Sequence, residues 1–219
     1  MIKEKLGHRI DGWIHTLFPF LFWRAISPNW MTVAGTVVAG ASGLAFAQGE
    51  MRLGGLLLLG GGFFDLVDGV VARHFGIATR FGAFLDSSLD RVVDILAMLG
   101  LFAFFVGKGE FLGASLCAVI LVATVLTSYA KARAELMLER MPGGLLERGE
   151  RIGLLAAGAL LGLLWPVLWV LAIGTLWTVG QRFSYAYAEM GRLDGEDQDG
   201  AEEDSAAPRD VEFASEETN

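Results

Sequence analysis

Long runs of apolar residues are the feature that most limits how this chain can fold. Four of these runs lie at about residues 31–47, 53–72, 81–106 and 111–130, and each has close to the roughly 20 residues that a helix needs to cross a lipid bilayer. Hydrophobic residues make up 53% of the 219-residue chain, and within the runs they are not confined to one helical face. The sequence therefore predicts an all-α integral membrane protein.

A fifth apolar run, residues 152–180, is long for one membrane-spanning helix and short for two, and Pro166 lies at its middle. If Pro166 marks a turn between two helices, nearly all lysines and arginines fall on one side of the membrane, and only Arg52 and Lys108 fall on the other. Cytoplasmic segments of membrane proteins carry such an excess of basic residues. We therefore expect six transmembrane helices, a multi-pass arrangement in the cell (inner) membrane, and both termini in the cytoplasm.

The two ends of the chain differ from the apolar runs. Residues 1–29 place apolar side chains at steps of three and four with basic residues between them, which is typical of an amphipathic juxtamembrane helix lying at the membrane interface. Pro19 interrupts the apolar stretch of this segment, so we do not expect a signal peptide. Residues 193–219 hold eleven of the 25 acidic residues. We therefore expect a transmembrane domain over 30–190 and a disordered, acidic cytoplasmic tail over 191–219.

Five aspartates stand inside segments that otherwise look suited to lipid: Asp65, Asp68, Asp86, Asp90 and Asp94. In helical geometry the first two share one face, and the other three share one face of the following helix. Charges at membrane depth are costly and are functional by default. Two facing helices joined by a short loop would bring at least four carboxylates together, and these groups repel one another unless a cation neutralises them.

A hard divalent cation fits this set of oxygen ligands. Mg²⁺ and Mn²⁺ take carboxylates and keep positions for water and substrate phosphate, and four carboxylates suggest two ions, an arrangement that serves displacement at phosphorus. Cys117 is the only cysteine, which excludes a cysteine-based metal site. For any single aspartate, Asp94 above all, a pore-facing or salt-bridged group is the competing interpretation. A divalent-cation channel or transporter lined by carboxylates is the alternative function.

The residues between the carboxylates indicate a phosphate-bearing substrate. Gly69 and Gly82 would let a nucleotide or a neighbouring helix approach the backbone closely. Arg73 and Thr79 add a guanidinium fork and a hydroxyl at the cytoplasmic rim. Because a basic pocket repels cations, these residues favour an enzyme over a cation transporter.

The motif Asp65-x2-Asp68-Gly69-x2-Ala72-Arg73-x8-Gly82-x3-Asp86-x3-Asp90 resembles the full signature of the CDP-alcohol phosphatidyltransferases. The resemblance implies six transmembrane helices after a juxtamembrane helix, a homodimer, and an active site in residues 30–190 that opens to the cytoplasm. It also implies that Asp65 and Asp86 bridge two metal ions, while Asp68 holds one ion and Asp90 the other. Asp90 would in addition accept the proton of the attacking hydroxyl.

The resemblance further implies a lipid donor, CDP-diacylglycerol or a CDP-ether lipid, whose CDP part contacts Gly69, Arg73 and Thr79. The segment "SPNWMT" resembles the family's Pro-Asn-x-x-Thr element, which touches the nucleotide. Its positions in this sequence are Pro28, Asn29, Trp30, Met31 and Thr32. From the residues alone this segment is a helix start, in which Pro28 breaks the preceding helix and Asn29 can serve as the N-cap.

Basic residues near the later helix ends bear on the acceptor alcohol. The segments "TSYAKARAE", "LLERGERIG" and "TVGQRFSY" would bring several cations to the cytoplasmic side, which suits an acceptor that already carries a phosphate. They resemble the prokaryotic branch that makes phosphatidylinositol phosphate, or its archaeal ether-lipid counterpart, from inositol 1-phosphate. The matching positions are Ser128, Lys131, Arg151 and Arg182.

Two alternatives stay open for these basic residues. The stretch between Arg151 and Arg182 is short for that branch, which keeps the neighbouring branch that converts glycerol 3-phosphate to phosphatidylglycerophosphate as an alternative. The bases could instead only flank helices at the level of the lipid headgroups. In either case the expected partners are a lipid bilayer and small phosphorylated molecules, with no nucleic acid.

Overall fold

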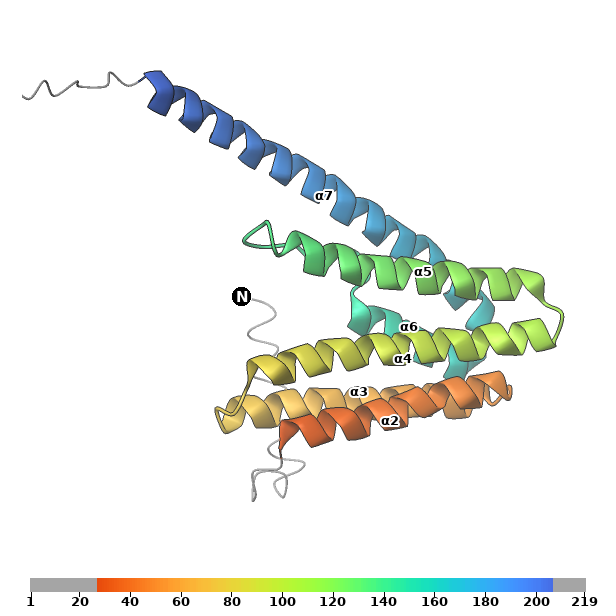
Figure 1. Ribbon diagram of the computed structural model, residues 1–219. Coiled ribbons are helices and arrows are strands. Elements are labelled where there is room, and N and C mark those ends of the chain that lie inside the picture. The colour runs from red at the N-terminus through yellow and green to blue at the C-terminus, as the bar shows by residue number, and fades with distance from the viewer. Residues whose placement is uncertain (1–26, 207–219) are drawn as a thin grey trace, which may run out of the picture.

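The computed structural model describes residues 27–206, which form six α-helices and no strand within that range (Figure 1). The predicted juxtamembrane helix falls almost entirely on residues 1–26, which lie outside the described residues. The helices are α2 (Pro28–Ala47), α3 (Met51–His74), α4 (Arg80–Gly107), α5 (Phe111–Ala134), α6 (Arg148–Leu161) and α7 (Leu164–Ala206). The all-α class predicted from the sequence is therefore confirmed for the described part of the chain.

The helices pack as two groups that α4 and α6 connect. Helix α2 packs against α3 and α4, while α5 packs against α4 and α7, and the short α6 contacts both α3 and α7. Figure 1 shows α2, α3 and α4 running together, with α7 extending well past the other helices at one end. The main core lies where these groups meet and contains Leu58, Leu101, Ile120 and Leu168.

Small residues set the closest helix crossings. At the contact of α2 with α4, a side chain on Gly100 would collide with the backbone of Gly43. At the contact of α2 with α3, a side chain on Gly61 would collide with Ala39. Such small residues let helix backbones approach closely in membrane proteins, where lipid supplies no hydrophobic force between helices. These crossings hold both α3 and α4 against α2.

Four of the described helices are long and apolar enough to cross a membrane, over Asn29–Ala47, Met51–Val71, Phe111–Ala134 and Leu164–Glu196. Helix α4 has 28 residues but carries several charged groups in its first half. Helix α6 has only 14 residues, about 21 Å at 1.5 Å per residue, which is shorter than the roughly 30 Å hydrocarbon core of a bilayer.

The fifth apolar run does form two helices, but the break lies before Pro166. Helix α6 ends at Leu161, and Gly162 adopts a left-handed backbone conformation with φ 73°, which glycine reaches without a steric penalty. Helix α7 begins at Leu164, so Pro166 lies in its first turn, where a residue without an N–H removes no helical hydrogen bond.

The end of α7 differs from the expectation of a disordered tail that begins at residue 191. The structure continues the helix to Ala206, and residues 207–219 lie outside the described residues. Arg192 pairs with Glu189 at 2.6 Å and with Glu196, one helical turn away on either side. Such pairs stabilise a helix, and Leu193 adds a contact with the cluster of Ala134, Leu138 and Met141.

Candidate active site

Three aspartates from two helices meet in one cluster. Asp65 and Asp68 on α3 and Asp86 on α4 each offer a carboxylate oxygen, and these oxygens lie within 4.8 Å of one another. The predicted register produces this arrangement, because the i, i+3 pair on α3 faces the first turns of α4 across the short connection 75–79. Such a set of oxygens is suited to a divalent cation.

The burial of these carboxylates supports the same assignment. Asp68 is 7% exposed, and its Oδ2 accepts a hydrogen bond of 2.6 Å from Thr32 Oγ1 on α2. Asp86 Oδ1 is buried and has no hydrogen-bond partner among the described residues. An unpaired carboxylate oxygen beside two further carboxylates is costly, and a bound cation would satisfy it.

Asp90 lies one turn further along α4 and outside the three-residue cluster. Its Oδ1 forms an ion pair with Arg148 Nη2 at 2.8 Å. The other terminal nitrogen, Arg148 Nη1, donates a hydrogen bond to Asp65 Oδ2 at 3.0 Å. Arg148 is the first residue of α6, so one guanidinium connects α6 with both α3 and α4. The sequence placed Arg148 among the cytoplasmic bases but did not place it in the site.

A cavity of about 210 Å³ opens beside the cluster, and residues of α2, α3 and α4 line it together with the loop before α4. Four of the predicted CDP contacts lie in its wall, namely Asn29, Thr32, Gly69 and Thr79, together with Asp68, Gly82 and Asp86. A side chain on Gly82 would press against Asn29 Oδ1 and Thr79 Oγ1. Glycine at this position therefore preserves the space between the two helix starts.

Other residues of the predicted nucleotide element lie elsewhere. Trp30 is 73% exposed and Met31 is buried against Val67, Val70 and Val71, so neither side chain belongs to the wall of this cavity. The side chains of Pro28 and Arg73 lie outside the described part of the structure.

The cap of α2 corrects one sequence prediction. Ser27, not Asn29, occupies the N-cap position, and Pro28 follows it in the first turn of the helix, because the fixed φ of proline suits that turn. Asn29 is consequently inside the helix and turns toward the cavity. Thr79 is the cap of α4, and its Oγ1 accepts a hydrogen bond of 2.9 Å from Gly82 N.

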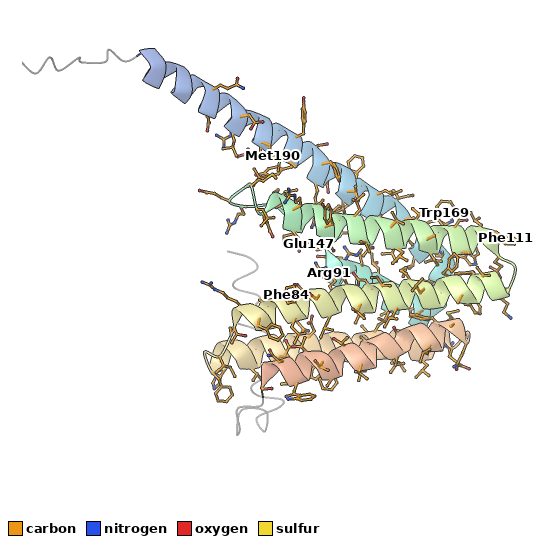
Figure 2. The ribbon with its side chains drawn as sticks, viewed as in Figure 1. Phe84, Arg91, Phe111, Glu147, Trp169 and Met190 are labelled. Carbon is orange, nitrogen blue, oxygen red and sulfur yellow. The ribbon has the colours of Figure 1, made fainter. Side chains whose placement is uncertain are left out.

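The predicted acceptor residues separate into two pairs. Ser128 and Lys131 line a cavity of about 680 Å³ between α4 and α5, together with Ser87 and Arg91 on α4. Figure 2 shows Arg91 on α4, on the side of that helix facing α5 and α6. Lys131 also pairs with Glu135 at 3.7 Å. Its charged and hydroxyl-bearing side chains are the groups that a phosphorylated alcohol requires.

Arg151 and Arg182 are buried away from that cavity, each 7% exposed. Arg151 donates to Asp94 Oδ2 at 3.0 Å and to the carbonyl oxygen of Leu146 at 3.2 Å, and Arg182 donates to the carbonyl oxygen of Thr127. Arg182 thus contacts the backbone of α5 at Thr127, whereas the next residue, Ser128, lines the cavity between α4 and α5. The expected convergence of all four residues on one open pocket is therefore not found.

Comparison with known proteins identifies the class of protein that this fold and site define. Residues 25–180 match the CDP-alcohol phosphatidyltransferase family, and relatives that are 37% and 36% identical align over 77% and 76% of this chain. The chain therefore belongs to the CDP-alcohol phosphatidyltransferase family and is a transferase.

Among the particular proteins that it resembles are synthases of inositol lipids. The phosphatidylinositol phosphate synthase of Mycobacteroides abscessus is 37% identical over 179 residues, covering 77% of this chain and 80% of that protein. The archaetidylinositol phosphate synthase of Methanothermobacter thermautotrophicus is 36% identical over 172 residues, covering 76% and 86%.

Two crystal structures of the phosphatidylinositol phosphate synthase of Mycobacterium tuberculosis share the fold. The structure with CDP-DAG bound has a TM-score of 0.69 and 28% identity, and covers 84% of this chain and 94% of that one. The structure in complex with manganese and citrate has a TM-score of 0.71 and 30% identity, and covers 77% and 86%.

Proposed function

We propose that this chain transfers a phosphatidyl group, or its ether-lipid equivalent, from a CDP-lipid to inositol 1-phosphate, releasing CMP and forming phosphatidylinositol phosphate. The observation that carries this proposal is the meeting of an aspartate cluster, Asp65, Asp68 and Asp86, with the cavity lined by Asn29, Thr32 and Thr79. The proposed metal ligands and the proposed nucleotide contacts would thus share one space, as transfer from a nucleotide-activated lipid requires.

The donor would bind with its CDP part in the cavity of about 210 Å³ and its pyrophosphate toward the aspartates. Asp65, Asp68, Asp86 and Asp90 would hold two ions, Mg²⁺ or Mn²⁺, which when bound neutralise the pyrophosphate and polarise the phosphorus under attack. Gly69 and Gly82, which line this cavity, would let the nucleotide approach the backbone closely. Arg73, at the cytoplasmic end of α3, is the proposed partner of the phosphate charge.

Asp90 is the proposed general base. It would take the proton of the acceptor hydroxyl, whose oxygen then forms a bond to the phosphorus nearest the lipid while the bond from that phosphorus to CMP breaks. Before an ion binds, the ion pair with Arg148 fixes the direction of the Asp90 carboxylate. Ser128 and Lys131 would bind the acceptor phosphate, with Arg151 and Arg182 behind them.

The proposed setting is the cell membrane, with residues 30–190 as the catalytic domain. Helices α4 and α6 would join the four apolar helices as the fifth and sixth spans, since α4 tolerates charged groups only where they face the site. Lysines and arginines gather at the helix ends near the site, which supports a site that opens to the cytoplasm. We also propose that two copies of this chain form a homodimer.

CMP release by the detergent-purified protein tests the function. The protein is supplied with Mn²⁺ or Mg²⁺ and CDP-diacylglycerol, and then with inositol 1-phosphate, glycerol 3-phosphate or free inositol. We expect release with inositol 1-phosphate alone, and a loss of roughly 10³-fold in Asp90→Asn, the variant without the base. Release that depends on glycerol 3-phosphate would identify that compound as the acceptor in place of inositol 1-phosphate. Release with none of the three would contradict the proposal.

A further inference from the structure

Arg148 forms the most complete ion-pair contact in the candidate site. Its two terminal nitrogens reach Asp65 Oδ2 at 3.0 Å and Asp90 Oδ1 at 2.8 Å, and its side chain is only 26% exposed. A guanidinium that bridges two carboxylates in this way is held more firmly than a single ion pair, because both of its hydrogen-bonding arms are used.

The same two carboxylates belong to the proposed set of metal ligands. Arg148 and a metal ion would therefore compete for Asp65 and Asp90. Asp65 is one of the three clustered aspartates, and Asp90 stands outside the cluster, turned toward Arg148. Arg148 Nη2 already contacts Asp90 Oδ1, so a cation bound to either oxygen of this carboxylate would lie close to the guanidinium. Two positive groups that need the same carboxylates repel each other strongly where water is scarce.

The surroundings of Arg148 leave room for it to withdraw. A cavity of about 310 Å³ lies between α3 and α6 and is lined by Arg148 and Asp65 together with Phe63, Gly149 and Gly153. The two glycines have no atom within 4 Å of the position where a side chain would begin. Arg148 Nε is buried and has no hydrogen-bond partner among the described residues, so only the two terminal nitrogens tie the guanidinium in place.

We propose that Arg148 is an internal counter-cation that shares Asp65 and Asp90 with a divalent ion, so that pairing with Arg148 and ion binding at Asp90 exclude each other. The inference rests on the proposed metal-dependent function. It follows that an ion which engages Asp90 displaces the guanidinium toward the cavity between α3 and α6. Arg148 thereby positions Asp90 until the ion arrives and weakens the affinity of the site for that ion.

The test is a titration of the purified full-length protein with Mn²⁺ in the absence of any substrate, followed by electron paramagnetic resonance of the free ion and by calorimetry. We expect Arg148→Gln to bind Mn²⁺ roughly tenfold more tightly than the unaltered chain. Arg148→Lys keeps the charge but cannot reach both carboxylates, so its affinity should fall between the two. This second variant carries the test if Arg148→Gln does not fold.

Arg91→Gln is the matched control, because it removes the same charge from a residue that lies 3.8 Å from Asp90 Oδ2 and donates to the carbonyl oxygen of Ser87 instead. Its Mn²⁺ affinity should change by no more than about twofold. Unchanged or weaker binding in both Arg148 variants would overturn the inference. Equal tightening in Arg91→Gln would overturn it too, as would the absence of Mn²⁺ binding in every form. Failure of CMP release with these affinities intact would count only against the proposed function.

Discussion

At the scale of single residues, the interior of this protein resolves a choice that the sequence left open for Asp94. Its carboxylate lies against Arg151, with both side chains less than 10% exposed, so Asp94 is a salt-bridged group rather than a pore-facing one. Its Oδ1 has no partner in the described structure, and it borders a cavity of about 20 Å³, enough for one water molecule. Asp94 thus neutralises Arg151, a residue that the proposed function assigns to the acceptor.

Removing either member of this pair should destabilise the protein more than removing both. Asp94→Asn leaves the Arg151 guanidinium buried without its counter-charge, which costs roughly 3–5 kcal/mol. The double variant Asp94→Leu with Arg151→Leu should recover most of that loss, because neither charge is then buried. Thermal unfolding in detergent measures both. Additive losses in the double variant would show that the two residues act independently.

At the scale of elements, the contact between α2 and α4 decides how the aspartates of α4 meet those of α3. Gly43 and Gly100 lie backbone to backbone at this contact, so the helices cross with no side chain between them. Helix α4 carries Asp86 about four turns before that crossing, on the same rigid rod. The contact between Gly43 and Gly100, about four turns away from the site, therefore helps to set the distance between α3 and α4 at the aspartates.

Gly100→Ala should disturb this crossing. The added methyl group would collide with the carbonyl oxygen of Gly43, which is backbone and cannot move aside, so we expect a loss of roughly 1–3 kcal/mol from overpacking. Gly107→Ala, at the end of the same helix and with no neighbour within 4 Å, is the matched control and should leave stability nearly unchanged. Apparent melting temperatures of the two variants compare them. Equal melting temperatures would argue against a tight α2–α4 contact.

At the scale of the whole molecule, the long α7 connects regions that are far apart in the sequence. Its Thr178 Oγ1 accepts a hydrogen bond of 3.1 Å from Leu146 N, and its Gln181 Oε1 accepts one of 2.9 Å from Leu145 N. These bonds hold the segment that leads into α6, directly before Arg148. Further along, α7 covers Leu138 and Met141 of the same connection. The position of Arg148 in the site is therefore supported from α7.

Shortening α7 tests this support. A chain ended after Gly191 loses Leu193 and its contact with Leu138 and Met141, and we expect a loss of about 1 kcal/mol, roughly 2–4 °C in Tm for a chain of this size. A chain ended after Glu196 keeps Leu193 and the pair of Arg192 with Glu196, so its Tm should stay above that of the shorter form. Identical Tm values would mean that the end of α7 does not stabilise the connection.

The sequence by itself determined the helical membrane class, the break of the last apolar run into two helices, and the family. It also predicted that Asp65, Asp68, Asp86 and Asp90 meet. The first three do, because helical spacing and a short connection between α3 and α4 are local properties of the chain, whereas Asp90 pairs with Arg148 instead. Two local predictions differed from the structure. The N-cap of α2 is Ser27 rather than Asn29, because Pro28 occupies the first turn. The first part of the acidic tail continues α7, where the ion pairs of Arg192 lie one turn apart.

Only the tertiary structure decided which arginine reaches the aspartates. Arg148 and Arg151 stand one turn apart on α6, and nothing in their spacing distinguishes them. The rotation of α6 between α3 and α7 sends Arg148 to Asp65 and Asp90 and buries Arg151 against Asp94. This rotation depends on packing between segments that are 57 and 83 residues apart, and such contacts leave no periodic signal in the sequence.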